Sequence, residues 1–402
     1  MTYFVTLDDK KECVGVFCNG ELHFDSFPSE LHYTWSPSAS LIPLGATHAE
    51  FGYFYANGKS LTEVCPAHLQ EDWVGLNKRM DAYVRSFRIA KVDLEHNCVF
   101  DLVPHQYLLR YCDLQTQIIK HVFKTHEKPQ NYDFMRSVGE MLLEIQSQKI
   151  KLNLAFLKGR FINKRARDFS QALEKGKKDN YVSYDAFKTK TGRLSVKKGS
   201  FPILNLDKDF RRIVEPTHDW ILELDYNAAE LRTLLALAGK EQPREDIHRW
   251  NSGILGVSRS EAKNSVISWL YGSKTSDIGE ELSQLYAKEK VLNDFYDVES
   301  GVVTTPFKRK LKADAHHALN YLVQSTTADL VFDRMLEIRE HLKDKKSFIK
   351  FCLHDSVVID LDHEERGEIK HILKIFSETK LGNFRSSVAA GRNFGDLQIM
   401  NT

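Results

Sequence analysis

Hydrophobic residues recur along this chain in two kinds of pattern, one helical and one extended. Between residues 102 and 152 they return at helical spacing in two long stretches, which are interrupted around residues 126–131. This pattern predicts an antiparallel pair of helices. Residues 3–7, 14–18 and 21–24 have the short apolar runs of strands, and Asn19-Gly20 has the composition of a tight hairpin turn.

Two further apolar runs each end at an aspartate. Residues 220–224 predict a strand that brings Asp225 to the start of a helix at residues 228–238. Residues 348–361 predict a hairpin with His354-Asp355 at its turn. Taken singly, Asp225 has the residue type of a helix cap and Asp355 that of a turn former. Taken together, two carboxylates at strand ends predict a two-cation site for in-line phosphoryl transfer.

Residues 258–272 predict a helix with a charged and an apolar half on one face. Ser258 and Glu261 form a capping box at its start. The face consists of four residues spaced four apart: Arg259, Lys263, Ile267 and Tyr271. Cationic side chains followed by apolar ones suit a nucleotide lying along the helix, with its phosphates on the arginine and the lysine. A solvated basic end on an amphipathic helix is the simpler alternative.

In this order and spacing the motifs resemble those of family A DNA polymerases, from about residue 100 to the C-terminus. The matching segments are Thr191-Gly-Arg-Leu-Ser195, Asp225-Tyr226 with Glu230-Leu231-Arg232, Asp246-Ile247-His248, Arg259 with Lys263 and Tyr271-Gly272, Asn320 with Gln324, His354-Asp355, and Gly391-Arg-Asn-Phe394. The resemblance implies an α+β right-hand polymerase of palm, fingers and thumb. It also implies template-directed addition of dNTPs to a primer 3′-hydroxyl.

The resemblance assigns a role to each matching position. Asp225, Asp355 and Lys263 would be catalytic, and two Mg²⁺ ions, or Mn²⁺ in their place, would be held by Asp225, Asp355 and the Tyr226 carbonyl. The dNTP would be bound by Arg259, Lys263, His248, Glu230, Ile267 and Tyr271, and Glu230 would exclude ribose. DNA would be contacted by Arg193, His316, Asn320, Gln324, His354, Lys197 and Lys198. A polar helix surface is the alternative for His316, Asn320 and Gln324.

Four positions depart from the family pattern. Ile267 stands where the family has an aromatic ring, Ser356 where it has a glutamate, His316 where it has an arginine, and Ser325 where it has a glycine. Ser356 removes one candidate carboxylate from the cation site. Tyr271-Gly272-Ser273 and His354-Asp355-Ser356 also resemble single-subunit phage RNA polymerases, so RNA synthesis or primer-independent synthesis is the alternative function. Glu230 favours DNA synthesis, because the RNA enzymes carry a small residue there.

Charge is balanced over the whole chain but not locally. The formal net charge is +1, which does not by itself indicate nucleic acid. Residues 149–212, however, hold 18 Lys and Arg against 6 Asp and Glu. The band includes Lys158, Arg160, Lys164, Arg165, Arg167, Lys175, Lys177 and Lys178. A basic band upstream of the active-site strand predicts contact with duplex phosphates, in a salt-sensitive manner.

The six cysteines show no C-x-x-C spacing, so neither a zinc site nor a disulfide framework is expected. No signal peptide or long apolar run is seen, and we expect no membrane association. A cytoplasmic location is expected, as for a viral protein acting in its host.

The domains predicted on this basis are an N-terminal domain (1–100), a thumb with a connecting basic region (101–180), the first half of the palm (181–232), reduced fingers (233–305) and the second half of the palm (306–402). The N-terminal domain would be small and α/β or β-rich, either a degenerate exonuclease-like domain or a docking surface. Asp8-Asp9 and Asp93-Leu-Glu95 do not complete an exonuclease carboxylate set, so no nuclease activity is expected. A separate exonuclease, helicase or processivity factor would be a partner, and a simple structural cap is the alternative.

Overall fold

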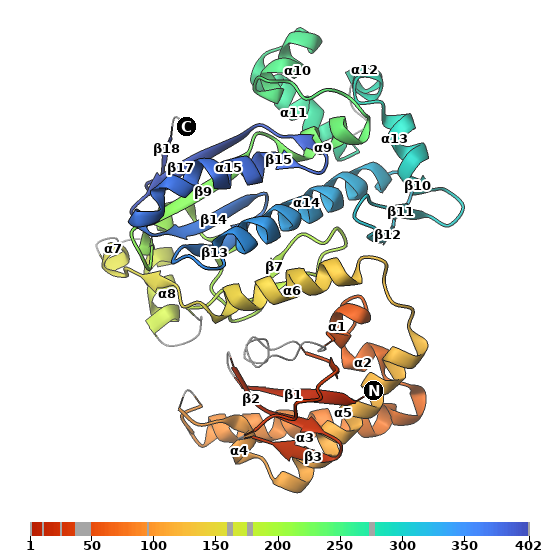
Figure 1. Ribbon diagram of the computed structural model, residues 1–402, viewed down its shortest axis with the longest axis vertical. Helices are drawn as coiled ribbons and strands as arrows, with labels where there is room; N and C mark the ends of the chain where they lie inside the picture. Colours follow the sequence, from red (N-terminus) through yellow and green to blue (C-terminus); the bar gives the residue numbers. More distant parts are fainter. Residues whose placement is uncertain are drawn as a thin grey trace. The chain divides into compact units, whose positions relative to one another are not determined.

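A computed structural model describes residues 2–9, 12–24, 26–36, 50–94, 96–158, 164–174, 180–272 and 278–400. The chain divides into two units, Met1–Ser147 and Gln148–Thr402 (Figure 1). Several residues of the predicted basic band, together with Glu95 and Ser273, lie outside the described residues; in the band these are Arg160, Lys175, Lys177 and Lys178.

The first unit is built on a four-stranded sheet in the order β3-β2-β1-β4. Its strands are β1 (Tyr3–Asp9), β2 (Glu12–Cys18), β3 (Glu21–His23) and β4 (Tyr33–Thr34). The first three are antiparallel, and β4 runs parallel to β1. Asn19 and Gly20 both have positive φ, at 52° and 88°, which is the backbone of a tight hairpin turn. The strands and this turn predicted near the N-terminus are confirmed.

The two helices predicted between residues 102 and 152 are present as α5 (His105–Thr125) and α6 (Tyr132–Ser147). They do not form the predicted antiparallel pair. The α5 helix packs against β1 and β2, whereas α6 packs against α1 (Gly52–Tyr55). The apolar stripe of α5 is therefore used to cover the sheet. The predicted boundary near residue 100 consequently falls inside the first unit.

The other helices of this unit are α2 (Leu61–Val64), η1 (Ala67–Leu69), α3 (Gln70–Ile89) and α4 (Val99–Leu102). Its core joins residues from the sheet, α3 and α5, among them Val5, Phe17, Trp73, Leu108 and Ile118.

The second unit is organised around an antiparallel sheet in the order β13-β14-β9-β17-β18 (Figure 1). Its strands are β13 (Phe348–Leu353), β14 (Ser356–Leu361), β9 (Trp220–Tyr226), β17 (Ser386–Gly391) and β18 (Gln398–Ile399). Two helices, α14 (Ala318–Leu342) and α15 (Ile369–Ser377), pack on each other and on this sheet. The predicted strand at 220–224 and the predicted hairpin at 348–361 are confirmed.

The alternation of side chains along β9 decides what faces the helices. The Tyr226 ring stacks on Phe376 of α15, with ring centroids 4.0 Å apart. Successive side chains of a strand point to opposite faces. Leu222, Leu224 and Tyr226 therefore face the helices and are buried, while Glu223 and Asp225 point to the opposite face.

A mainly helical subdomain follows β9, from Ala229 to Lys312. It comprises α9 (Ala229–Leu237), α10 (Ile247–Leu255), α11 (Arg259–Leu270), α12 (Ile278–Leu285), α13 (Lys288–Phe295), β10 (Tyr296–Asp297), β11 (Val302–Thr304) and β12 (Lys310–Lys312). Its core includes Leu234, Val266, Trp269 and Tyr286, and it continues into the first turns of α14 through Leu319 and Leu322.

Short elements complete the second unit: β5 (Lys151–Leu152), α7 (Ala155–Lys158), α8 (Lys164–Glu174), β6 (Tyr184–Asp185), β7 (Ser195–Val196), η2 (Ile203–Asn205), η3 (Lys208–Ile213), β8 (Val214–Glu215), η4 (His363–Glu368), β15 (Glu378–Thr379) and β16 (Gly382–Asn383). In the part of the chain that the structure describes, no helix is both long and apolar enough to cross a membrane.

Candidate active site

Asp225 and Asp355 lie side by side at one edge of the central sheet. Asp225 is the second-to-last residue of β9 and pairs in register with Ser356, the first residue of β14. Asp355 directly precedes Ser356 in the two-residue turn, where His354 adopts a left-handed backbone with φ 58°. The helix that follows β9 starts at Ala229 with Ala228 as its N-cap, and no side chain caps it. Asp225 therefore does not serve as the helix cap that its residue type allowed.

Glu223 is a third carboxylate at this position, and the sequence reasoning missed it. It lies two residues before Asp225 and so on the same face of β9. Its Oε1 is 3.3 Å from the Ser356 hydroxyl on the neighbouring strand. The alternation along β9 was the signal that could have identified Glu223.

Desolvation raises the pKa of all three carboxylates, and the charge of a neighbouring carboxylate adds to this at Asp225 and Glu223. Desolvation, followed by the charges of Asp355 and Glu223, raises the pKa of Asp225 to about 7. Desolvation also raises the pKa of Asp355, against the opposing effects of a backbone hydrogen bond, Arg193 and His354. The pKa of Glu223 is raised by desolvation as well, and Ser356 and Arg211 oppose this. Among the described residues none of the three is in an ion pair. Carboxylate oxygens are the ligands that Mg²⁺ prefers, although these three side chains do not bring one oxygen each within 4.8 Å of one another.

A cavity of about 310 Å³ adjoins Asp355. It brings together seven of the predicted site residues, from five separate segments of the chain: Arg193, Glu230, His248, Lys263, Ile267, His354 and Asp355. Asp225, Tyr226, Arg259 and Tyr271 are not among its lining residues. The cavity floor thus joins one of the paired aspartates to the predicted nucleotide-binding face.

The predicted helix that carries this face is confirmed as α11, with the capping box between Ser258 and Glu261. Its buried side is formed by Ala262, Val266, Trp269 and Leu270. Ile267 and Tyr271, on the opposite side, are 37% and 44% exposed. An exposed apolar pair on the same helix face as Arg259 and Lys263 is unlike a core face. Such a face suits the predicted contact with a nucleotide.

Glu230 on α9 holds two of the predicted residues together. Its carboxylate accepts a hydrogen bond from the Arg193 guanidinium and lies 3.3 Å from the Tyr271 hydroxyl. Burial raises the pKa of Glu230, and Arg193 and Tyr271 act in the opposite direction. The position predicted to select the sugar is therefore fixed from two sides.

Arg259 is engaged by a partner that the sequence did not suggest. Its Nε and Nη2 donate to the two carboxylate oxygens of Asp246 at 3.0 and 2.9 Å. Asp246 also caps α10 through the Arg249 amide and accepts from Asn227. The hydrogen bond from Arg259 is the largest cause that lowers the pKa of Asp246.

His248, two residues further along, is 7% exposed, and its Nδ1 is a buried polar atom without a hydrogen-bond partner among the described residues. Burial lowers the pKa of His248, so the imidazole is neutral at pH 7. Such an unpartnered polar atom is uncommon in a folded chain.

Two of the residues predicted to contact DNA, Asn320 and Gln324, lie at the start of α14. Asn320 and Gln324 are both buried and bond to each other, with Gln324 Nε2 donating to Asn320 Oδ1 at 2.6 Å. His316 lies over Gly272, where a Cβ would come within 2.6 Å of the imidazole. Lys197 and Lys198 follow β7 and are exposed. None of the five lines the cavity.

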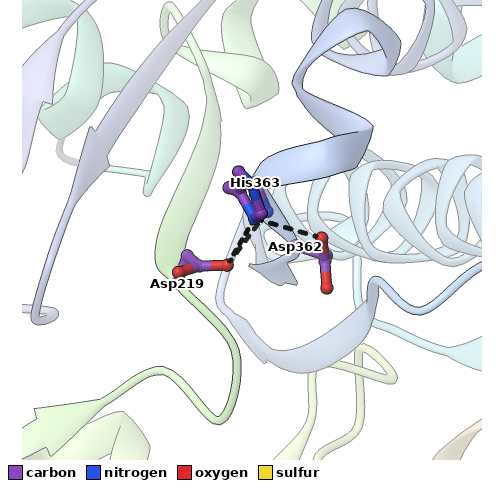
Figure 2. A group of neighbouring side chains, drawn as sticks. All are labelled: Asp219, Asp362 and His363. Carbon is purple, nitrogen blue, oxygen red and sulfur yellow. Dashed lines mark hydrogen bonds and ion pairs between the residues drawn. The ribbon is translucent and has the colours of Figure 1, made fainter.

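A second acidic cluster lies at the opposite end of the same strands (Figure 2). Asp219 precedes β9, and Asp362 and His363 follow β14. The Asp219 carboxylate already accepts from the His363 backbone amide at 3.1 Å and pairs with Arg392 at 3.6 Å. The hydrogen bond from His363 is the main cause that lowers the pKa of Asp219. These local pairs account for the cluster, which is not the predicted cation site.

Comparison with known proteins identifies two sequence relatives and a structure of similar fold. No protein-family model matches the chain. A stretch of 85 residues is 32% identical to DNA polymerase I of Borreliella burgdorferi and covers 20% of this chain and 9% of that protein. A stretch of 189 residues is 23% identical to a DNA polymerase of Mycobacterium phage L5 and covers 37% of this chain and 31% of that protein. The chain therefore spans less than a third of the length of these curated relatives.

Among solved structures, the chain is similar to the POL domain of Pol1 from M. smegmatis, in complex with DNA primer-template and dNTP. The TM-score is 0.63 at 13% identity, over 98% of this chain and 95% of the other. This likeness shows the fold and confirms the predicted α+β right-hand class. The fold and the two sequence matches together confirm the resemblance that the motifs predicted, which is to the family A DNA polymerases.

Proposed function

We propose that the chain is a DNA-directed DNA polymerase, which extends a primer by template-directed addition of dNTPs. The observation that carries the proposal is that Asp225 pairs with Ser356, the residue next to Asp355, and that Asp355 lines a cavity together with Lys263 and His248. In the proposed reaction the primer 3′-oxygen forms a bond to the α-phosphorus. The bond from that phosphorus to the bridging oxygen breaks, pyrophosphate leaves, and the hydroxyl proton passes to solvent.

Two Mg²⁺ ions, or Mn²⁺ ions, held by Asp225, Asp355 and the Tyr226 carbonyl, would lower the pKa of the attacking hydroxyl and neutralise the leaving pyrophosphate. The chemistry of the donors fits, because all are oxygens and none of the three clustered carboxylates is neutralised by an ion pair among described residues. The register of β9 and β14 fixes the two aspartates on rigid backbone, which supplies the positioning that phosphoryl transfer depends on.

Lys263 and His248 would bind the triphosphate from the cavity wall. Lys263 contributes a point charge, and the neutral His248 contributes a ring N–H. Arg259 would join them by exchanging its bidentate contact with Asp246 for one with phosphate, since both acceptors match the guanidinium fork. Nucleotide binding would in this way draw α11 away from the N-cap of α10.

Glu230 would occupy the space of a ribose 2′-hydroxyl, with Ile267 and Tyr271 against the sugar and the base. Its contacts with Arg193 and Tyr271 support this role, because they hold the carboxylate in one place. Primer-template DNA would be bound by Arg193, His316, Asn320, Gln324, His354, Lys197 and Lys198.

The palm would comprise residues 181–232 and 306–402 and the fingers 233–305, whereas the thumb and basic region predicted at 101–180 would be divided between the two units. Residues 1–100 would lack nuclease activity and would serve as a degenerate exonuclease-like or docking domain, to which a separate exonuclease, helicase or processivity factor would bind. The phage relative supports a viral protein that acts in its host cytoplasm.

Extension of a 5′-labelled primer on a template tests the proposal. We expect extension with Mg²⁺ and dNTPs, weak extension with rNTPs, and no shortening of a mismatched 3′ end without dNTPs. Asp225→Asn and Asp355→Asn should each reduce the rate at least ~100-fold, because the paired carboxylates supply several kcal/mol of charge stabilisation. Asp219→Asn, at the far end of the same strand, is the matched control and should leave the rate unchanged. Full activity in either active-site variant would contradict the proposal, and preferred use of rNTPs would favour the RNA-synthesising alternative.

A further inference from the structure

Glu223 lies near Asp225 and Ser356 at the edge of the central sheet. It is half-buried, shares one face of β9 with Asp225, and lies diagonally opposite Ser356 on β14, since Ser356 pairs with Asp225 and Val358 with Glu223. Diagonal neighbours on adjacent strands are within reach of a long side chain. The contact of 3.3 Å between Ser356 Oγ and Glu223 Oε1 shows that this reach is used.

The small side chain at Ser356 is what makes room for this contact. Ser356 stands where a carboxylate was expected from the resemblance, directly after Asp355. Ser356 is 3% exposed, and its one hydroxyl proton has two acceptors within reach, Glu223 Oε1 at 3.3 Å and the Leu353 carbonyl oxygen at 3.1 Å. A longer acidic side chain at the same point would occupy that space and repel Glu223. The chain thus has a serine on β14 and a glutamate on β9, within contact of each other.

Charge supplies a second, independent argument. Glu223, Asp225 and Asp355 form a group of three carboxylates, none of which is in an ion pair within the described residues. Arg211 acts on Glu223 only through its charge at a distance, and its guanidinium lies over the Phe394 ring at 4.9 Å. Clustered like charges destabilise a fold unless something compensates them. A bound divalent cation would provide that compensation.

We propose that Glu223, held by the Ser356 hydroxyl, supplies the third carboxylate of the cation site formed by Asp225 and Asp355. The inference rests on the proposed polymerase function. It assigns the third carboxylate to β9, whereas the resemblance led us to expect it at position 356 on β14. Glu223 would act on the cations directly or through one ordered water, and its removal would weaken their binding without affecting the nucleotide-binding face.

Binding of MnCl₂ to the protein alone, measured by electron paramagnetic resonance, gives a readout that does not depend on activity. Glu223→Gln keeps the shape and the hydrogen bond but removes the charge. We expect it to weaken Mn²⁺ binding about 10–100-fold, the range found when a residue that supports a metal is lost. Glu299→Gln, in the exposed turn after β10, is the matched control and should bind Mn²⁺ as the native chain does. Equal Mn²⁺ binding by Glu223→Gln and the native chain would overturn the inference.

Exchanging the two residues tests the same idea without relying on a single variant. Glu223→Ser alone should weaken Mn²⁺ binding and raise the Mg²⁺ concentration needed for half-maximal primer extension, while the KM for dNTP stays within about twofold. Adding Ser356→Glu in the same chain should restore Mn²⁺ binding and the native Mg²⁺ requirement, because the neighbouring strand then supplies the missing carboxylate. A double variant no better than Glu223→Ser would count against the proposal.

Failure of the two proposals can be told apart. If the native chain binds Mn²⁺ through Glu223 but does not extend primers, the polymerase function fails and the cation site stands. If the native chain extends primers and Glu223→Gln has unchanged Mg²⁺ dependence and Mn²⁺ binding, only the role of Glu223 fails.

Discussion

Neutralising Asp225 is expected to stabilise the protein while abolishing its proposed activity. In the native state the pKa of Asp225 is about 7, and its ordinary value, which applies to the unfolded chain, is 3.8. Between these two values the native state holds more protons than the unfolded state, so the stability falls as the pH rises. The penalty is fully present above pH 7 and disappears below about pH 4. Asp225→Asn removes it.

The gain in the free energy of unfolding expected for Asp225→Asn follows from that difference in pKa. A rise from 3.8 to about 7 corresponds to about 4 kcal/mol at full strength. The Asp225 side chain is open to solvent, and screening reduces the effect to about 1–2 kcal/mol. For a unit of this size that is a rise in Tm of about 2–6 °C. The gain should be largest at pH 8 and should shrink steadily as the pH is lowered from 7 toward 4.

Thermal melting followed by circular dichroism, in EDTA at pH 8 and pH 5, measures this effect. Asp360→Asn provides the contrast, because Lys350 and two backbone amides lower the pKa of Asp360 against the effect of its burial. Asp360→Asn leaves Lys350 buried without its ion-pair partner, and the free energy of unfolding should fall by about 3–5 kcal/mol. Adding MgCl₂ should raise the Tm of the native chain more than that of Asp225→Asn. If Asp225→Asn melts at or below the native chain at pH 8 in EDTA, the carboxylates are not in uncompensated repulsion and the reasoning is wrong.

Three further outcomes are expected. Gly192→Ala should destabilise the protein by about 1–3 kcal/mol in urea unfolding, because Gly192 has φ +76° and a Cβ there would lie 2.7 Å from the Arg309 guanidinium; no change would contradict the strain. Glu230→Ala should raise the kcat/KM for rNTPs relative to dNTPs at least ~10-fold in primer extension, and an unchanged ratio would remove Glu230 from sugar selection. Replacing Lys197 and Lys198 by Ala should lower the slope of log Kd for DNA against log salt concentration by the equivalent of up to about two phosphate contacts, measured by fluorescence anisotropy. An unchanged slope would show that neither lysine contacts the DNA phosphates.

Local features of the site were readable from the sequence because each depends on neighbouring residues. The strand that ends at Asp225, the hairpin turn at His354-Asp355 and the capping box at Ser258 all formed where the pattern predicted. Hydrophobic spacing and cap chemistry act over a few residues, so they survive without knowledge of the rest of the chain. The order of the motifs then indicated the polymerase fold.

Contacts between distant segments were decided only by the tertiary structure. The α5 helix has the apolar stripe of a helix-pair partner, yet it packs on β1 and β2, because a stripe does not specify which apolar surface covers it. The hydrogen bond from Arg259 to Asp246 could not be predicted from the sequence either, because it depends on where α11 meets the start of α10.

Glu223 shows the same limit at the centre of the site. The sequence placed Asp225 at the end of its strand and left one carboxylate missing at Ser356. Only the antiparallel register of β9 and β14 brings Glu223 to the Ser356 hydroxyl, and register is a property of the paired strands rather than of either one. The sequence by itself determined which motif residues are proposed to carry the chemistry. The sheet decided which additional carboxylate stands among them.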